Sequence, residues 1–283
     1  MKEIAYYHDR FVDVDERVIP IQERGHQFGD GIYEVIRVYD GEPFTMKEHM
    51  ERLEKSAEAI GMGLPYSREK IEALALEALE RSGIQEAEIY MQITRGIHLR
   101  QHHYPDPSEP VLSMVVKEAR KLTPEKRASG VPVITTEEIR WKMCWIKSLN
   151  LLPNVMAKQK AMEAGAHEAV FVDEGIVTEG SSSNLFIVKD GTLLTHPATN
   201  AILHGITRRV ILDIAEELGI PVEERTFTLE ELLEADEAFL SSTTMEAASI
   251  SAVDGTPLNG GRTILDRIHA RFVERTRRET VDS

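Results

Sequence analysis

The sequence is poor in cysteine and has no long apolar run. A single cysteine, Cys144, among 283 residues excludes an intrachain disulfide and any metal site built from several cysteines. No segment approaches the roughly 20 consecutive apolar residues of a membrane span. The first residues of the chain also turn polar too early for a signal peptide. We therefore expect a cytoplasmic protein without a membrane segment.

Positive charge is also scarce, with 33 Lys and Arg against 48 Asp and Glu and a formal net charge of -15. Proteins that bind nucleic acid usually present a basic surface, so this class is disfavoured. A small anionic ligand stays compatible, because a few local arginines can override the overall sign. The remaining composition, 42% hydrophobic and 29% charged, is that of a globular enzyme of one large or two ordinary domains.

The pattern of apolar residues predicts two α/β domains, an N-terminal one over 1–118 and a C-terminal one over 124–283, joined by a polar linker at 119–123. In the first domain we predict strands at 4–7, 18–21, 33–39, 88–95 and 111–117 and helices over 47–60 and 67–82. In the second domain we predict strands at 131–136, 168–172, 185–188 and 237–241 and helices over 154–164, 207–218 and 262–278. The polar segment 96–110 is long for a hairpin connection, which indicates a functional loop.

Lys147 is the first candidate for chemistry, because it lies in the apolar stretch W-K-M-C-W-I-K-S-L-N-L-L. Burial disfavours the ammonium form of a lysine, and a neutral amine can attack a carbonyl to form a Schiff base. The alternative is a structural lysine whose stem packs on the core while its amine reaches water. On this residue alone the structural alternative is the more frequent one.

Two later motifs would suit a pyridine ring that carries a phosphate. Glu179 precedes the small-residue turn Gly180–Asn184, where a carboxylate could pair with a pyridinium nitrogen; an ordinary surface turn is the alternative. Ile206 and Thr207 open a helix after Gly205, and a helix start favours a phosphate. For Thr207 the alternative is a simple N-cap.

The loop after Thr94 is dense in hydrogen-bond donors. Arg100 could hold a carboxylate through two parallel hydrogen bonds, and His102 could add a further donor. A metal site of His98, His102 and His103 is the alternative. We expect no metal, because no carboxylate lies within this histidine cluster.

In this order along the chain, the motifs resemble the fold-type IV pyridoxal-phosphate (PLP) enzymes, and among them the D-amino-acid aminotransferases. The resemblance spans nearly the whole sequence, from E-R-G-H-Q-F-G-D-G-I-Y-E at 23–34 through I-K-S-L-N at 146–150 and the tract 179–208 to S-S-T-T at 241–244. It implies a smaller N-terminal α/β domain, a larger C-terminal domain and PLP in the cleft between them. It also implies a homodimer in which a loop of one subunit completes the other subunit's site.

The resemblance assigns roles residue by residue. Lys147 would carry the internal aldimine and move the α-proton, and Glu179 would pair with the pyridine nitrogen. The other cofactor contacts would come from Arg52, Leu203, Ile206, Thr207, Ser242 and Thr243. The substrate carboxylate would be held by Tyr33 together with Arg100 and His102, the last two from the partner's loop.

The implied reaction is transamination between a D-amino acid such as D-alanine and a 2-oxo acid such as 2-oxoglutarate, giving pyruvate or another 2-oxo acid and D-glutamate. An L-branched-chain aminotransferase and an aminodeoxychorismate lyase are alternatives on the same fold, and both lack the Arg-x-His pair of this loop. A cofactor-binding homologue without turnover is a third. His26 stands where an aromatic is usual, and Arg37 is expected to line the substrate side of the strand that carries Tyr33.

Overall fold

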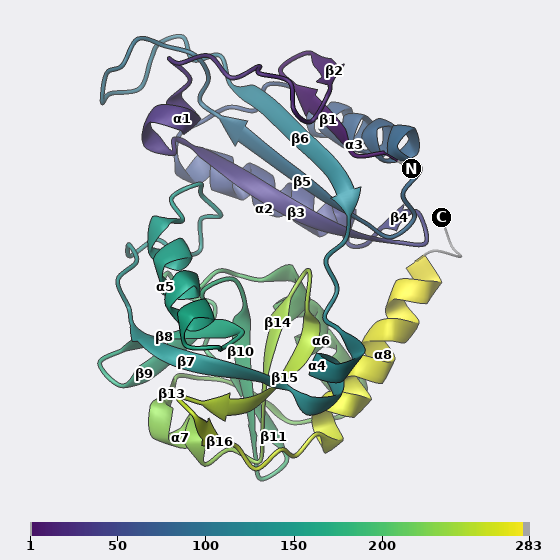
Figure 1. The fold of residues 1–283 in the computed structure, drawn as a ribbon, viewed down its shortest axis with the longest axis vertical. Coiled ribbons are helices and arrows are strands. Elements are labelled where there is room, and N and C mark those ends of the chain that lie inside the picture. Colours follow the sequence, from purple (N-terminus) through teal and green to yellow (C-terminus); the bar gives the residue numbers. More distant parts are fainter. Residues whose placement is uncertain (1, 280–283) are drawn as a thin grey trace. The chain divides into compact units, whose positions relative to one another are not determined.

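A computed structural model describes residues 2–279 and divides the chain into two compact units (Figure 1). The first unit comprises Met1–Arg120, Ile146–Asn150 and Arg277–Ser283, and the second comprises Lys121–Trp145 and Leu151–Thr276. None of the helices within 2–279 has the length and apolar character needed to cross a membrane.

The segment Ile146–Asn150 belongs to the first unit, whereas the sequence assigned it to the C-terminal domain. The reason is backbone pairing with strand β3 (Gly31–Tyr39). The Tyr33 N–H donates to the Lys147 carbonyl at 3.0 Å, and the Leu149 N–H donates to the Gly31 carbonyl at 3.0 Å. Lys147 is therefore fixed on the first unit by main-chain bonds that do not depend on its own side chain.

The first unit is built on a six-stranded antiparallel sheet in the order β2-β1-β6-β5-β3-β4. Helix α2 packs against β3, and α3 packs against β1 and β6. The bounds are β1 Ile4–Tyr7, β2 Arg10–Val12, α1 Arg24–Phe28, β3 Gly31–Tyr39, β4 Glu42–Pro43, α2 Met46–Ala59, α3 Arg68–Ser82, β5 Ala87–Thr94 and β6 Val111–Glu118.

One strand predicted in this unit is absent. Residues 18–21 form no strand. Pro20 has no N–H to donate to a sheet, and the side chains of Ile19 and Ile21 on either side of it are 60% and 79% exposed. Apolar residues alone therefore gave a wrong prediction here.

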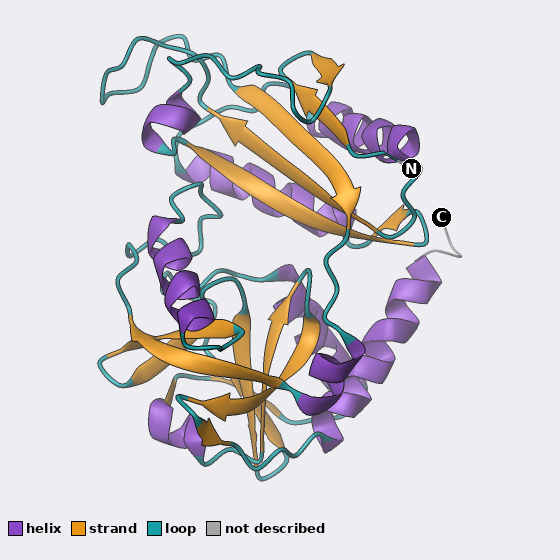
Figure 2. Ribbon diagram, viewed as in Figure 1, coloured by secondary structure: helices purple, strands orange, loops and turns teal. Residues whose placement is uncertain are grey.

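The second unit is built on a ten-stranded mixed sheet in which β7 pairs in parallel with β8 and β15, and the helices lie around the sheet (Figure 2). The strand order is β12-β11-β10-β14-β15-β7-β8-β9-β13, with β16 on β15. The bounds are α4 Pro124–Ser129, β7 Val131–Glu137, α5 Leu152–Glu163, β8 Glu168–Asp173, β9 Ile176–Gly180, β10 Asn184–Lys189, β11 Thr192–Thr195, α6 Ile206–Glu217, β12 Val222–Glu224, β13 Phe227–Thr228, α7 Leu229–Leu233, β14 Glu237–Ser242, β15 Glu246–Val253, β16 Thr256–Pro257 and α8 Thr263–Glu279.

Two glycines allow the turn between β9 and β10 to approach the start of α6. A Cβ on Gly180 would lie 2.2 Å from the Ser183 hydroxyl oxygen, and a Cβ on Gly205 would lie 2.0 Å from Oδ1 of Asn184. Neither distance is physically accessible, so any side chain at these positions would push the two segments apart. Glu179, at the end of β9, is thereby held close to the helix start.

Candidate active site

Lys147 lies beside an aromatic ring in the first unit. Its Nζ is 4.2 Å from the centroid of the Tyr33 ring, and its backbone N–H donates to the Ser56 hydroxyl at 3.2 Å. The side chain is half-buried. An ammonium over an aromatic face is stabilised by the ring's electrons, so Tyr33 favours the form of Lys147 that has taken up a proton.

A buried carboxylate orients Arg52. Glu34 follows Tyr33 on β3 and is fully buried. It accepts hydrogen bonds from Nε and Nη2 of Arg52, both at 2.7 Å, and contacts Nδ1 of His49 at 2.7 Å. Burial opposes ionisation of Glu34, but the charge and hydrogen bonds of Arg52, with those of His49, hold its pKa well below the usual range. The guanidinium predicted to bind phosphate is therefore held in a fixed orientation.

The same burial acts on His49. Desolvation lowers the pKa of its imidazole despite the neighbouring Glu34, and the charges of Arg52 and Lys147 lower it further. His49 is consequently neutral near pH 7, and its Nδ1 must carry the proton that it shares with the Glu34 carboxylate. The sequence pattern did not single out Glu34 or His49.

Arg100 and His102 meet on one ring. The guanidinium carbon of Arg100 is 4.7 Å from the centroid of Phe28, and that of Arg24 is 4.8 Å from the same centroid. The His102 imidazole meets the Phe28 ring edge-on, with centroids 5.7 Å apart. The structure thus brings the two predicted carboxylate donors together, on a phenylalanine that the sequence did not single out for this purpose.

The loop that carries these donors is anchored at its base. Arg24 and Arg95 both donate from Nε to the Asp30 carboxylate, at 2.7 and 2.9 Å. Arg24 also donates to the carbonyl of Gln101 at 2.7 Å, and the Arg95 guanidinium lies 3.5 Å from the centroid of Tyr104. Among residues 2–279, the histidines of this loop form no cluster able to hold a metal ion.

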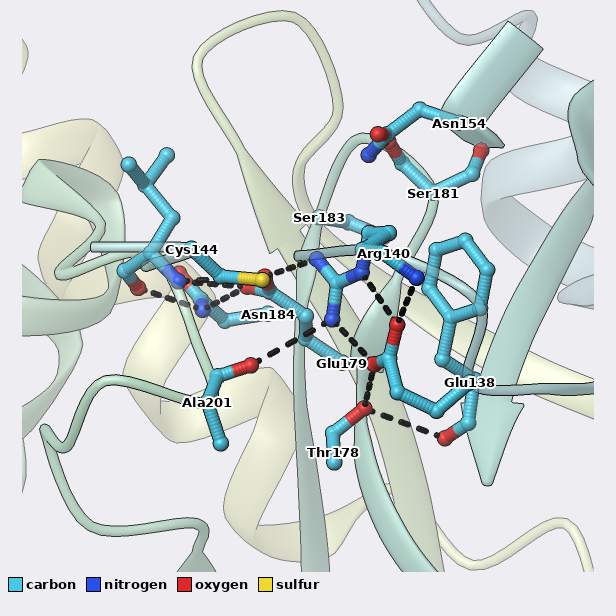
Figure 3. A network of polar contacts seen from close by, with 12 residues as sticks. Glu138, Arg140, Cys144, Asn154, Thr178, Glu179, Ser181, Ser183, Asn184 and Ala201 are labelled. Carbon is cyan, nitrogen blue, oxygen red and sulfur yellow. Dashed lines mark hydrogen bonds and ion pairs between the residues drawn. The ribbon is translucent and has the colours of Figure 1, made fainter. Parts of the chain in front are cut away.

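Glu179 sits in a network of donors in the second unit (Figure 3). Arg140 Nη1 donates to its Oε1 at 2.5 Å, and Asn184 Nδ2 donates to its Oε2 at 2.9 Å. The Leu203 N–H donates to both oxygens, at 3.0 and 3.1 Å. The Asn184 amide also donates to the Leu203 carbonyl at 2.9 Å. One asparagine therefore ties the carboxylate to the segment that precedes α6.

Burial raises the pKa of Glu179 to about 7, although the charge and hydrogen bond of Arg140 and the Leu203 N–H act in the opposite direction. The nearby Glu138 raises it further. A buried carboxylate in this state is incompletely compensated, so a cationic ligand group would be stabilised next to it. Arg140 and Glu138 were not predicted, because nothing in their sequence spacing connects them with Glu179.

The raised pKa predicts that the stability of the unliganded protein depends on pH. Folded Glu179 binds its proton more tightly than an ordinary glutamic acid with a pKa of 4.5. Its contribution to stability is therefore fully present below about pH 4.5 and is lost as the pH rises towards 7, by at most about 3 kcal/mol. Urea unfolding at pH 5 and pH 7.5 checks this. The decrease should be larger in the wild type than in Glu179→Gln, and equal decreases would show that Glu179 does not titrate in this range.

A buried glutamate fixes the serine turn that follows Glu179. Glu168 is fully buried and accepts hydrogen bonds from the hydroxyls of Ser181, Ser182 and Ser183. A turn whose three hydroxyls share one carboxylate has little freedom to rearrange. Glu168 therefore supports the geometry of Glu179, although the sequence showed it only as part of a strand.

The start of α6 offers free backbone donors. The N-cap is Gly205, which provides no side-chain hydrogen bond to the helix, so Thr207 is the second helical residue rather than the cap. The first N–H groups of a helix without a side-chain cap are suited to an anion. Ile206 and Thr207 are both buried. This arrangement favours the phosphate role predicted for them.

Ser242 and Thr243 lie at the turn between β14 and β15. Asn184 on β10 pairs with Ser241 on β14, so this turn follows next to the Glu179–Asn184 segment. The Ser241 hydroxyl is buried and has no hydrogen-bond partner among the described residues. The Ser242 hydroxyl accepts from the Met245 N–H at 3.1 Å.

Arg37 does not play the part expected of it. Its buried guanidinium donates to Glu86 at 2.6 Å and to the carbonyls of Val38 and Ala87 at 2.9 and 3.0 Å. A guanidinium with these partners is committed to holding strand ends together. The prediction that it lines the substrate side was wrong. His26, the other unusual position, is exposed on α1.

Comparison with known proteins agrees with this donor set. The Amino-transferase class IV family model matches residues 31–253. The D-alanine aminotransferase of Listeria monocytogenes serotype 4b (strain F2365) is 45% identical over 271 residues, covering 94% of this chain and 93% of its own. That of Bacillus licheniformis is 43% identical over 256 residues, covering 90% of each chain.

Solved structures show the same fold. A branched-chain aminotransferase from Thermoproteus uzoniensis with norvaline has a TM-score of 0.84 at 30% identity, covering 94% of this chain and 92% of its own. A second branched-chain aminotransferase, from T.th. and solved with pyridoxamine 5'-phosphate, has a TM-score of 0.89 at 28% identity, covering 95% of this chain and 92% of its own. Together with the family match, these likenesses establish that the chain belongs to the class IV aminotransferase family.

Proposed function

We propose that this chain is a PLP-dependent aminotransferase that exchanges an amino group between D-amino acids such as D-alanine and 2-oxo acids such as 2-oxoglutarate. The products would be pyruvate or another 2-oxo acid and D-glutamate. The observation that carries the proposal is the pair Arg100 and His102 on Phe28. Identity of 43–45% to curated D-alanine aminotransferases over at least 90% of the chain supports it.

The donor set fits PLP. The uncapped start of α6 at Ile206 and Thr207, with Arg52, Ser242 and Thr243, suits a phosphate. Glu179 is a buried carboxylate with an incompletely compensated charge, which suits a protonated ring nitrogen. Leu203 would pack against the ring. The cofactor would supply an electron sink for the charge left when the α-proton is removed, and residues of both units would hold it.

The work left to the chain's own residues is binding and proton transfer. Lys147 would hold PLP through its amine and, once released, would carry the α-proton of the substrate. The Tyr33 ring 4.2 Å from Nζ stabilises the protonated form of that amine during the transfer. Glu34 keeps the Arg52 guanidinium oriented so that it can act on the phosphate without first ordering itself.

Handedness follows from where the carboxylate is held. Arg100 and His102, with Tyr33, would bind the substrate carboxylate. Lys147 reaches the α-carbon from one side only, so the α-hydrogen must point to that side. With the carboxylate fixed, one enantiomer presents its hydrogen correctly, and exchanging the carboxylate and side-chain positions would reverse the choice.

The proposal includes a homodimer in which the loop of one subunit completes the site of the other. Arg100 and His102 are exposed, which suits donors that act on a neighbouring subunit. Helix α5 also exposes apolar side chains spaced along one face, a surface that association would bury; they are Leu152, Val155, Met156 and Met162, with 70%, 60%, 48% and 59% exposed.

An L-branched-chain aminotransferase is the less supported alternative. The structural neighbours named for that activity share 30% and 28% identity with this chain, below the 43–45% of the D-alanine aminotransferases. The fold likeness applies to both groups. The Arg100 and His102 pair favours the D-specific alternative.

Single-turnover reactions with D-alanine and L-alanine test the proposal. We expect D-alanine to bleach the absorbance of the bound cofactor and to yield one equivalent of pyruvate, whereas L-alanine reacts far more slowly. Reaction with L-alanine alone would make the D-assignment wrong. A protein that binds PLP but stays inert with both enantiomers of every amino acid tried would indicate a homologue without turnover.

A further inference from the structure

Arg140 lies between two carboxylates in the second unit (Figure 3). Its Nε and Nη2 donate to Oε1 and Oε2 of Glu138 at 2.8 and 2.6 Å, whereas only Nη1 reaches Glu179, at 2.5 Å. Nη2 also donates to the Ala201 carbonyl at 3.3 Å, and the guanidinium stacks over Phe171 at 4.3 Å. The bidentate partner of Arg140 is therefore Glu138, and Glu179 receives a single hydrogen bond.

Glu138 is itself held in place. The backbone N–H of Arg140 donates to its Oε1 at 3.0 Å, and the Thr178 hydroxyl, one residue before Glu179, donates to its Oε2 at 3.1 Å. All three ionisable side chains are nearly buried, with 13% exposure for Glu138, 6% for Arg140 and 5% for Glu179. Glu138 is thus a fixed part of the same network as Glu179.

The charges of this network do not cancel. Two carboxylates and one guanidinium, all ionised, leave one negative charge. Burial opposes the charge of Arg140, but the hydrogen bonds of Glu138 and the charges of both carboxylates raise its pKa, so it stays cationic. A buried cluster with one surplus negative charge is suited to a ligand group that brings one positive charge.

We propose that Glu138 and Arg140 are positioning residues that act together: Arg140 orients the Glu179 carboxylate, while Glu138 occupies the guanidinium so that Glu179 keeps its negative charge for a protonated ring nitrogen. The inference rests on the proposed function, because it concerns the ring of bound PLP. Without Glu138, Arg140 would neutralise Glu179 and the nitrogen would hold its proton less tightly. Without Arg140, the cluster would be more negative and the nitrogen would hold its proton more tightly.

The other groups that face Glu179 in the second unit do not alter this count. Asn184 and the Leu203 N–H are neutral donors. Burial raises the pKa of the Cys144 thiol to about 11, so it is uncharged near neutral pH. The charges that decide the state of the carboxylate therefore come from Arg140 and Glu138.

Nitrogen NMR of protein reconstituted with PLP labelled with ¹⁵N in the ring tests the inference directly, because protonated and neutral pyridine nitrogens have well-separated shifts. We expect the ring nitrogen of Glu138→Gln to lose its proton at a lower pH than in the wild type, and that of Arg140→Gln at a higher pH. Each displacement should be on the order of one to two pH units, as a single charge a few ångströms away would produce. Glu137→Gln, the exposed neighbour, is the matched control and should leave the titration unchanged.

Opposite displacements separate an electrostatic role from a structural one, since loss of packing would not move the two variants in opposite directions. If Glu138→Gln does not fold, Arg140→Gln alone still decides the sign. Titrations that coincide with the wild type in both variants would overturn the inference, and so would displacements of the same sign. If the wild-type nitrogen is neutral, or if Glu179→Gln leaves it protonated, the proposed pairing of Glu179 with the ring fails instead.

Discussion

Lys147→Ala is expected to abolish transamination, lowering kcat by about four orders of magnitude or more, because the chain loses the amine that would attach the cofactor and carry the α-proton. The fold should survive. The segment is held to β3 by main-chain hydrogen bonds, and the lysine side chain contributes only a contact with the Tyr33 ring. Steady-state rates with D-alanine and 2-oxoglutarate, beside thermal unfolding curves, measure both expectations.

Lys142→Ala is the matched control, since Lys142 is exposed and lies five residues earlier in the same segment. It should keep the wild-type rate. Full activity in Lys147→Ala would remove the whole assignment of function. An inactive variant that is also unfolded would have to be replaced by Lys147→Gln, which keeps more of the side-chain stem over Tyr33.

Arg100→Ala should lower kcat/KM for D-alanine by about 100-fold, with most of the effect in KM, because a charge-assisted hydrogen-bond pair to the carboxylate is lost. The preference for D- over L-alanine should fall at the same time, since the carboxylate no longer has one fixed position. Rates with both enantiomers over a range of concentrations give the two quantities separately.

His103→Ala is the corresponding control on the same loop, because His103 is exposed and adjacent to His102. We expect it to change neither KM nor the preference for D-alanine. An Arg100→Ala enzyme with unchanged KM and unchanged preference would show that the carboxylate is bound elsewhere. The transaminase assignment would stand in that case, and only the source of the D-preference would be wrong.

The sequence predicted residues whose neighbours along the chain reveal them. Lys147 lies in an apolar run, and Gly205 with Ile206 and Thr207 marks a helix start, which the structure confirms. Both signals are local, because burial patterns and helix starts are encoded within a few residues.

The residues that were missed act through space. Glu34 orients Arg52 from 18 positions away, and Arg140 reaches Glu179 across 39 positions. A single sequence does not show which acidic residue a given arginine will meet after folding. The same limitation explains Arg37, whose partner Glu86 lies 49 positions further along the chain, after helices α2 and α3.

The loop 96–110 and the turn at Gly180 differ in how much change they can absorb. At Gly180 and Gly205 the backbone and Asn184 already touch, so any added atom displaces Glu179. The loop instead is fastened at Asp30 and Phe28 and carries exposed side chains beyond those points. A change of substrate preference is therefore open to this chain at its loop, by ordinary substitution, without rebuilding the part that is proposed to hold the cofactor.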